Sequence, residues 1–116
     1  MLLNLITDME LYWHRAFVRE LKDFPLETQE NMLALIRKFA NGEKLPPVNF
    51  KTFRIDKKIK IQEFRIKDFN GNWRAISVML QKNRLVLLYA FHKKTQILTP
   101  KDKEVIRARL RGYEND

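Results

Sequence analysis

The residues best suited to chemistry are one carboxylate and several cations in the second half of the chain. Glu63, Arg65 and Lys67 occupy alternate positions, and Arg74 follows after a short interval. Alternate residues of a strand point to the same face, so the first three side chains would share one surface. Like charges that face each other destabilise a sheet. We therefore interpret this group as a site for an anionic ligand.

A predicted tight turn brings Arg74 onto the same surface. Asn70 and Gly71 both tolerate the positive φ of a two-residue type I′ turn. Such a turn places Lys67 directly opposite Arg74, and directly opposed residues of antiparallel strands share a face. The predicted patch then holds one carboxylate and three cations: Glu63, Arg65, Lys67 and Arg74.

A second hairpin decides whether a histidine joins this patch. A two-residue loop near 82–84 would place Arg74 opposite Phe91, whereas a loop of about three residues would place it opposite His92. We favour the three-residue loop, which also brings Lys94 to the same face. The alternative for His92 is a histidine at a strand end that is hydrogen-bonded to the backbone.

The first half of the chain is expected to be helical. Apolar residues at spacings of three and four predict helices over 8–23 and from Pro25 to a cap at Asn41-Gly42. The segment 43–58 is expected to be irregular, because its Pro-Pro pair opposes regular strand pairing.

The second half is expected to form the sheet and a last helix. Thr99 and Asp102 have the spacing of a helix N-terminal cap, and this helix should end near Gly112. The expected fold is therefore a single α+β domain over 1–116, in which a helical hairpin precedes a three-stranded or four-stranded antiparallel sheet and a C-terminal helix. The strands are predicted over 59–67, 73–80 and 85–92.

Charge and composition narrow the class of partner. The net charge is +9, and residues 1–56 are neutral, so residues 57–116 carry all of the excess. Such a concentration favours nucleic acid as the partner, although a merely basic domain remains an alternative. The chain has no cysteine, which excludes disulfides and thiolate chemistry, and its longest apolar run, 85–91, is too short to cross a bilayer. We expect a cytoplasmic protein that does not bind membranes.

Three motifs resemble those of the RelE/ParE superfamily of toxins. The run 62–66 (QEFRI) resembles the E-L-R strand of these toxins, and 71–74 (GNWR) resembles their G-x-[YW]-R turn. The run 87–96 (LLYAFHKKTQ), followed by Thr99-Pro100, resembles the signature of the HigB-like branch. The resemblance covers roughly residues 10–112. It implies a RelE-like fold, although the strand that often begins such toxins is not evident before Asp8.

The resemblance also implies an activity. Proteins of this type are ribosome-associated mRNA endonucleases, and each is paired with an antitoxin. We expect cleavage without metal or cofactor by attack of the RNA 2′-hydroxyl, with Glu63 as base and His92 as acid. Glu63 could instead only neutralise Arg65. The expected partners are mRNA on the ribosome and a helix-turn-helix antitoxin with an acidic contact surface.

Each expected site residue has an assigned role. Arg65 and Arg74 would clamp phosphoryl oxygens, and Lys94 could stabilise the leaving oxygen. Trp73 could stack on a base, although packing in the core is an alternative. The expected catalytic residues are Glu63, Arg65, Arg74, His92 and Lys94, and the expected RNA-binding residues are Lys67, Trp73, Lys93 and Gln96.

Two rival functions remain open. A ParE-like toxin that binds DNA gyrase shares the fold but should not need a histidine beside the arginines. A non-catalytic basic module that binds nucleic acid or an acidic partner would also fit the charge. An RNA cleavage assay with and without ribosomes separates the three.

Overall fold

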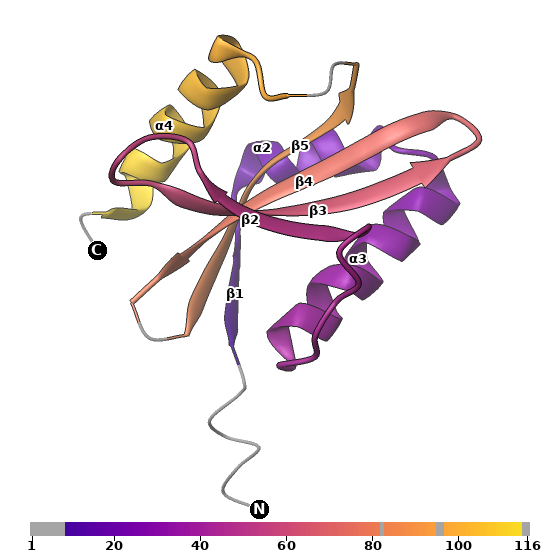
Figure 1. The fold of residues 1–116 in the computed structure, drawn as a ribbon, viewed down its shortest axis with the longest axis horizontal. Helices are drawn as coiled ribbons and strands as arrows, with labels where there is room; N and C mark the ends of the chain where they lie inside the picture. The colour runs from indigo at the N-terminus through magenta and orange to yellow at the C-terminus, as the bar shows by residue number, and fades with distance from the viewer. Residues whose placement is uncertain (1–8, 82, 95–96, 115–116) are drawn as a thin grey trace, which may run out of the picture.

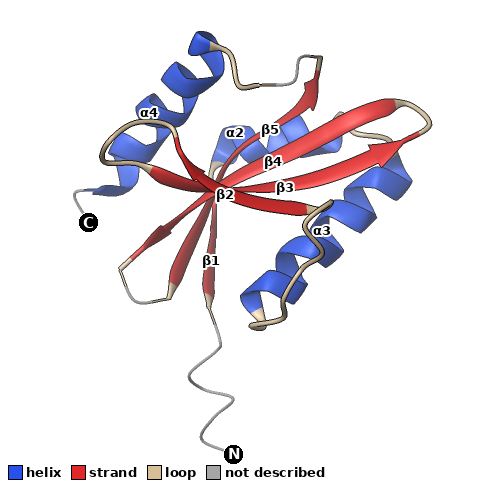
Figure 2. Cartoon of the chain, in the orientation of Figure 1, coloured by secondary structure: helices blue, strands red, loops and turns tan. Residues whose placement is uncertain are grey.

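The computed structural model describes residues 9–81, 83–94 and 97–114. In these segments a five-stranded mixed sheet has the strand order β1-β5-β4-β3-β2. Two helices cover one face of the sheet and a third covers the other (Figures 1 and 2). The elements are β1 (Glu10–Trp13), α2 (Arg15–Lys22), α3 (Leu26–Ala40), β2 (Phe50–Arg54), β3 (Lys60–Asp68), β4 (Gly71–Leu80), β5 (Arg84–Lys93) and α4 (Pro100–Glu114).

Each face of the sheet has its own hydrophobic core. Phe17 of α2 and Met32 of α3 pack with Phe64 of the sheet on one face. Ile106 and Leu110 of α4 pack on the opposite face. We call this second surface the α4 face. Within the described residues, no helix is long and apolar enough to cross a membrane.

The α+β class is confirmed, but the predicted helical hairpin followed by three or four antiparallel strands is wrong. β1 lies inside the range predicted as helix and pairs in parallel with β5. Leu11 packs with the α2 and α3 core whereas Tyr12 packs with the α4 core, which is the alternation of a strand. The apolar spacing of α2 extends into this segment, so the sequence pattern suggested one longer helix.

The segment predicted as irregular contains the edge strand β2. Phe50 packs on one face of the sheet and Phe53 on the other, as an odd spacing requires in a strand. β2 pairs antiparallel with β3, which places Lys51 opposite Glu63. The two prolines lie before the strand begins, so they remove no hydrogen bond from the sheet.

The first hairpin is closed by Phe69 and Asn70 instead of Asn70 and Gly71. Asp68 pairs with Gly71, so Arg65 and not Lys67 lies opposite Arg74. The predicted Lys67–Arg74 pairing is therefore wrong. The observed register differs from the predicted one by two residues. Because side chains of a strand alternate with a period of two, the same four residues still share one face, namely Glu63, Arg65, Lys67 and Arg74.

Contacts of Asp68 set this register. Its Oδ1 accepts hydrogen bonds from Asn70 N at 2.8 Å and Trp73 Nε1 at 2.9 Å, and its Oδ2 accepts one from the Thr28 hydroxyl of α3. Gly71 has a φ of +133°, and a Cβ built there would lie 2.2 Å from Nε2 of His92. The contact of Asp68 with Thr28 and the close approach of His92 to Gly71 therefore determine which two residues form the turn.

The second hairpin also differs from the prediction. β4 ends at Leu80, which pairs with Arg84, and Gln81 has the positive φ of the turn. Further along, the register shifts by one residue between Ile76 and Ser77. As a result Arg74 lies opposite Phe91, and the predicted pairing of Arg74 with His92 is wrong.

An ion pair covers part of the edge of β5 beyond the end of β1. Oε1 of Glu20 in α2 accepts a hydrogen bond from Ala90 N at 3.1 Å, and Nη1 of Arg109 in α4 donates one to Leu88 O at 2.8 Å. The two side chains also bind each other at 2.8 Å. This pair satisfies backbone groups of the strand edge and joins α2 to α4.

The predicted cap of the last helix is confirmed. Asp102 Oδ2 accepts from Thr99 N at 3.0 Å, and Thr99 Oγ1 accepts from Asp102 N at 3.1 Å. Asp102 Oδ1 also accepts from the Tyr89 hydroxyl at 2.8 Å. Burial and this hydrogen bond raise the pKa of Tyr89 above its ordinary value.

Replacing Asp102 by alanine should destabilise the protein by about 1–3 kcal/mol. The change removes the carboxylate that accepts from Thr99 N at the helix cap and the acceptor of the Tyr89 hydroxyl, while Thr99 Oγ1 can still accept from the backbone N–H of residue 102. Urea unfolding measures the effect. Asp102→Asn is the matched comparison and should lose less stability, because its single amide oxygen keeps one of the two hydrogen bonds. An Asp102→Ala protein as stable as the original chain would contradict this role of the cap.

Candidate functional site

The candidate site is a cluster of one carboxylate and three cations on the α4 face, contributed by β3, β4 and β5. Glu63 Oε1 accepts a hydrogen bond from Arg65 Nε at 2.7 Å. Arg74 Nε lies 3.7 Å from the same oxygen, and Lys93 Nζ lies 3.8 Å from Glu63 Oε2. We call Glu63, Arg65, Arg74 and Lys93 the basic cluster.

The side chains of the basic cluster differ in how far they are exposed to solvent. The Glu63 side chain is 0% exposed, Lys93 6%, Arg74 13% and Arg65 26%. The carboxylate is therefore inaccessible, whereas the cations keep some contact with solvent. One negative charge is surrounded by three positive charges, so the cluster keeps an excess of two positive charges.

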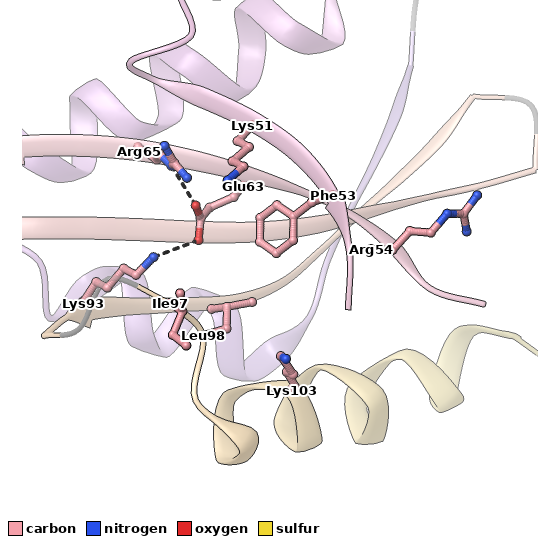
Figure 3. A pocket seen from close by; sticks show the side chains of 9 residues that line it. All are labelled: Lys51, Phe53, Arg54, Glu63, Arg65, Lys93, Ile97, Leu98 and Lys103. Carbon is pink, nitrogen blue, oxygen red and sulfur yellow. Dashed lines mark hydrogen bonds and ion pairs between the residues drawn. The ribbon is translucent and has the colours of Figure 1, made fainter. Parts of the chain in front are cut away.

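The basic cluster borders a pocket of about 300 Å³ between β2, β3, the end of β5 and α4 (Figure 3). Figure 3 shows the Glu63 carboxylate between Arg65 and Lys93. Phe53 and Leu98 supply apolar parts of the wall. The remaining lining residues are Lys51, Arg54, Ile97 and Lys103, so further cations surround the opening.

The electrostatic environment lowers the affinity of Lys93 for its proton. Burial lowers the pKa of Lys93, and the nearby charges of Arg74, Arg65 and Lys51 lower it further, against the opposing effect of Glu63. Burial also lowers the pKa of Arg74, and Arg65 adds to this effect while Glu63 opposes it. A lysine in such surroundings loses its proton more easily than an exposed lysine.

Hydrogen bonding in the cluster is incomplete. Glu63 Oε2 and Arg74 Nε are buried and have no hydrogen-bond partner within the described residues. Buried charged groups normally have such partners, because an unsatisfied one is costly. An excess of positive charge beside a pocket and a buried arginine N–H without an acceptor are features expected of a site that receives an anion.

A family model matches residues 19–111, and its description is "Phage derived protein Gp49-like (DUF891)". The chain belongs to this Gp49-like family. The family is RelE-like and related to toxin–antitoxin systems. The matched region contains every residue of the basic cluster. Among curated proteins, no significant match to the chain was found.

The Gp49-like chain brings together four of the residues that the sequence singled out, namely the basic cluster itself. Arg65 and Arg74 were expected to clamp phosphate, and they lie directly opposite each other in adjacent strands. Lys67 lies on the same face nearer to the turn, opposite Asn72, and is exposed.

His92 and Trp73 lie on the other face of the sheet. The two residues are paired across β4 and β5, and their rings stack at 4.4 Å with an interplanar angle of 21°. Trp73 also contacts Phe24 at 4.7 Å between ring centroids and is buried, so it belongs to the core. The predicted placement of His92 beside Arg74 is wrong, because the register shift turns its side chain away.

The other expected residues are not brought into the cluster. Lys94 follows the end of β5, is exposed, and does not line the pocket. Gln96 lies outside the described residues. Within the described part of the chain, no three histidine, cysteine or acidic side chains gather as they would to hold a metal ion.

Three cations of the pocket were missed by sequence reasoning, namely Lys51, Arg54 and Lys103. Lys51 lies opposite Glu63 in the β2–β3 pairing, and Lys103 reaches the pocket from the first turns of α4. Lys51 could have been found from the Phe50 and Phe53 spacing if β2 had been recognised as a strand. No sequence signal identified Lys103, because its position depends on how α4 crosses the sheet.

Proposed function

We propose that this Gp49-like chain is the toxin of a type II toxin–antitoxin system and cleaves RNA at the basic cluster. The observation that carries the proposal is the gathering of Arg65, Arg74 and Lys93 around one inaccessible carboxylate beside a pocket. The motif over 87–96 supports the HigB-like branch. The substrate would be mRNA, cut in the cytoplasm and on the ribosome, and an antitoxin would hold the toxin inactive.

The two arginines would bind the phosphate at which cleavage occurs. Guanidinium groups donate several hydrogen bonds in a fixed plane that suits phosphoryl oxygens. Arg65 lines the pocket and Arg74 lies directly opposite Arg65 in the next strand, so the two would act together on one phosphate bound there. They would stabilise the negative charge that grows on the phosphoryl oxygens in the transition state.

Lys93 is the group best placed to transfer a proton. Its neutral amine would take the proton of the RNA 2′-hydroxyl, whose oxygen then bonds to phosphorus while the bond to the 5′ oxygen breaks. The leaving oxygen would take a proton from water. Because DNA lacks this hydroxyl, it should not be cleaved.

Glu63 fits a positioning role better than the role of base. Its side chain has no exposed surface, so an RNA hydroxyl cannot contact it without displacing the arginines. It holds Arg65 through a 2.7 Å hydrogen bond and lies within ion-pair distance of the other two cations. This geometry favours the alternative in which the carboxylate neutralises and orients its neighbours.

One observation favours a second candidate, a ParE-like toxin that binds DNA gyrase. The histidine that would distinguish an RNA endonuclease from such a toxin does not lie beside the arginines. The two candidates differ in a simple assay. A protein that arrests growth, inhibits gyrase and leaves RNA intact with and without ribosomes would be the ParE-like toxin.

Replacing Arg74 by glutamine should lower RNA cleavage by about 10²–10³-fold, which is the usual effect of losing one donor to a transition-state oxyanion. Growth inhibition should disappear with it. The fold should persist, because Glu63 keeps Arg65 and Lys93 as partners. Cleavage of mRNA with and without ribosomes, together with circular dichroism, measures both expectations.

The matched control is Arg37→Gln, which removes an exposed arginine of α3 on the opposite face. This variant should cleave RNA and inhibit growth as the original chain does. If a folded Arg74→Gln protein remained fully toxic, the phosphate would have to bind elsewhere and the proposal would be overturned.

A further inference from the structure

A second hollow follows the pocket of the basic cluster along α4. It has a volume of about 540 Å³ and is lined by the β2–β3 loop and the second half of α4. Figure 1 shows this loop beside α4. The pocket of the cluster is lined by Arg54 and Lys103, which belong to β2 and to the first half of α4. The two hollows therefore lie next to each other along α4, and we call them together the α4 groove.

The walls of the α4 groove are strongly basic. Among the described residues that line its two hollows, nine are lysine or arginine and two are acidic, and both acids already form ion pairs. The acids are Glu63 of the basic cluster and Asp56, which binds Arg107 at 3.0 Å. Exposed Glu104 of α4 lines neither hollow.

Three of these cations form a stripe along one side of α4. Lys103, Arg107 and Arg111 are spaced four residues apart, so they lie on the same side of the helix. Like charges at this spacing destabilise an isolated helix. Within the described residues, only Arg107 of the three has an acidic partner within ion-pair distance. Helix stability therefore does not explain the stripe.

We propose that the α4 groove binds the phosphate backbone of a single-stranded RNA on one side of the basic cluster. This inference deepens the proposed function, because it extends the path of the same RNA. The stripe from Lys103 to Arg111 rises by about 12 Å, which is long enough to lie beside roughly two to four phosphates.

The lining of the second hollow favours RNA over an acidic protein segment. Five of the six residues of the second hollow are charged, and Ile59 is the apolar exception. A specific protein partner usually needs an apolar or aromatic anchor at the centre of its interface. A nucleic-acid backbone needs only a track of cations, and the second hollow lies next to the one that holds the cations of the proposed cleavage site.

The test removes two cations of the second hollow and compares them with two others. Lys58→Gln/Arg111→Gln changes exposed residues that make no ion pair within the described part of the chain. The control, Arg37→Gln/Lys38→Gln, removes the same charge from exposed positions of α3 on the opposite face. The probe is a ten-nucleotide RNA with 2′-O-methyl groups, which lacks the nucleophile and remains intact during the measurement.

The groove variant should bind this RNA about tenfold more weakly at moderate salt. Its slope of log K against log salt should become shallower by about 1.4, because each contact to a single strand contributes about 0.7. The loss should be smaller for a four-nucleotide RNA, which is too short to fill both hollows. The control variant should bind both RNAs as the original chain does.

Three outcomes would overturn the proposal: equal binding by the groove variant, an equal loss in the control variant, or a loss of binding to a poly-glutamate peptide without a loss for RNA. The last result would assign the groove to an acidic protein segment. Because the probe cannot be cleaved, these outcomes do not depend on nuclease activity, and RNA binding by a chain that never cleaves RNA would overturn only the proposed function.

Discussion

Replacing Lys93 by glutamine should lower RNA cleavage by about 10²–10⁴-fold, the usual contribution of a general base. Glutamine keeps a polar side chain beside Glu63, but its amide is not a base and cannot take the proton of the 2′-hydroxyl. Lys93→Arg should lose nearly as much, because arginine keeps the charge and stays protonated. Single-turnover cleavage of a short mRNA measures the chemical step.

Lys94→Gln is the matched control, because this neighbouring lysine is exposed and lies outside the pocket. It should retain most of the cleavage activity. An active Lys93→Arg enzyme would show that position 93 contributes charge alone, and the base would then have to be sought elsewhere.

The rate of cleavage by the original chain should rise with pH. The base form of Lys93 is the neutral amine, whose fraction grows about tenfold per pH unit below its pKa. Burial lowers this pKa from the ordinary value of 10.5, so the rise should level off below that value. A histidine acting as acid gives the opposite slope near neutral pH. A rate that falls with pH would therefore favour the acid mechanism.

Replacing Glu63 by glutamine should destabilise the protein by about 3–5 kcal/mol, the usual effect of removing one partner from a buried ion pair. The change leaves Arg65, Arg74 and Lys93 close together without a compensating charge. Urea or thermal unfolding measures the loss. Glu104→Gln, which removes an exposed carboxylate of α4, should change stability by less than about 1 kcal/mol.

Added phosphate should restore part of the stability of Glu63→Gln. An anion that binds the native state stabilises it in proportion to the logarithm of its concentration. The midpoint of thermal unfolding should therefore rise more with phosphate in Glu63→Gln than in the original chain, at constant ionic strength. Equal stability of the two proteins without phosphate would show that Glu63 does not hold the cluster together.

The sequence predicted the face that carries the site better than the contacts within it. Glu63, Arg65 and Arg74 were placed together because a strand alternates with a period of two, and a slip of two residues preserves that alternation. The slip itself depends on Asp68, whose carboxylate binds Thr28 of another element. A local turn signal contains no information about such a distant contact.

His92 shows the same limit more strongly. Its side chain is turned to the opposite face by a one-residue register shift in the middle of β4 and β5. A shift of one residue reverses every side chain beyond it. Glycine and proline are the usual sequence signals of such an irregularity. The shift falls between Ile76 and Ser77, so neither signal marks it in the sequence.

The strand β1 was missed because its partner is far away in the chain. Glu10 pairs with Arg84, and a parallel pairing of this kind has no turn that announces it. The predicted end of α3 at Asn41-Gly42, by contrast, depends on local residues, and Gly42 has the expected positive φ of 85°.

The pairing of β1 with β5 also determines when the sheet can be completed during synthesis of the chain. Glu10 leaves the ribosome long before Arg84, so β1 must remain unpaired until most of the domain has been made. Contacts between such distant residues form late and slowly. Lys93, which completes the basic cluster, is synthesised after both strands have begun. A nascent chain therefore lacks the complete basic cluster, and under the proposed function the ribosome that produces this protein would be spared RNA cleavage until the sheet has closed.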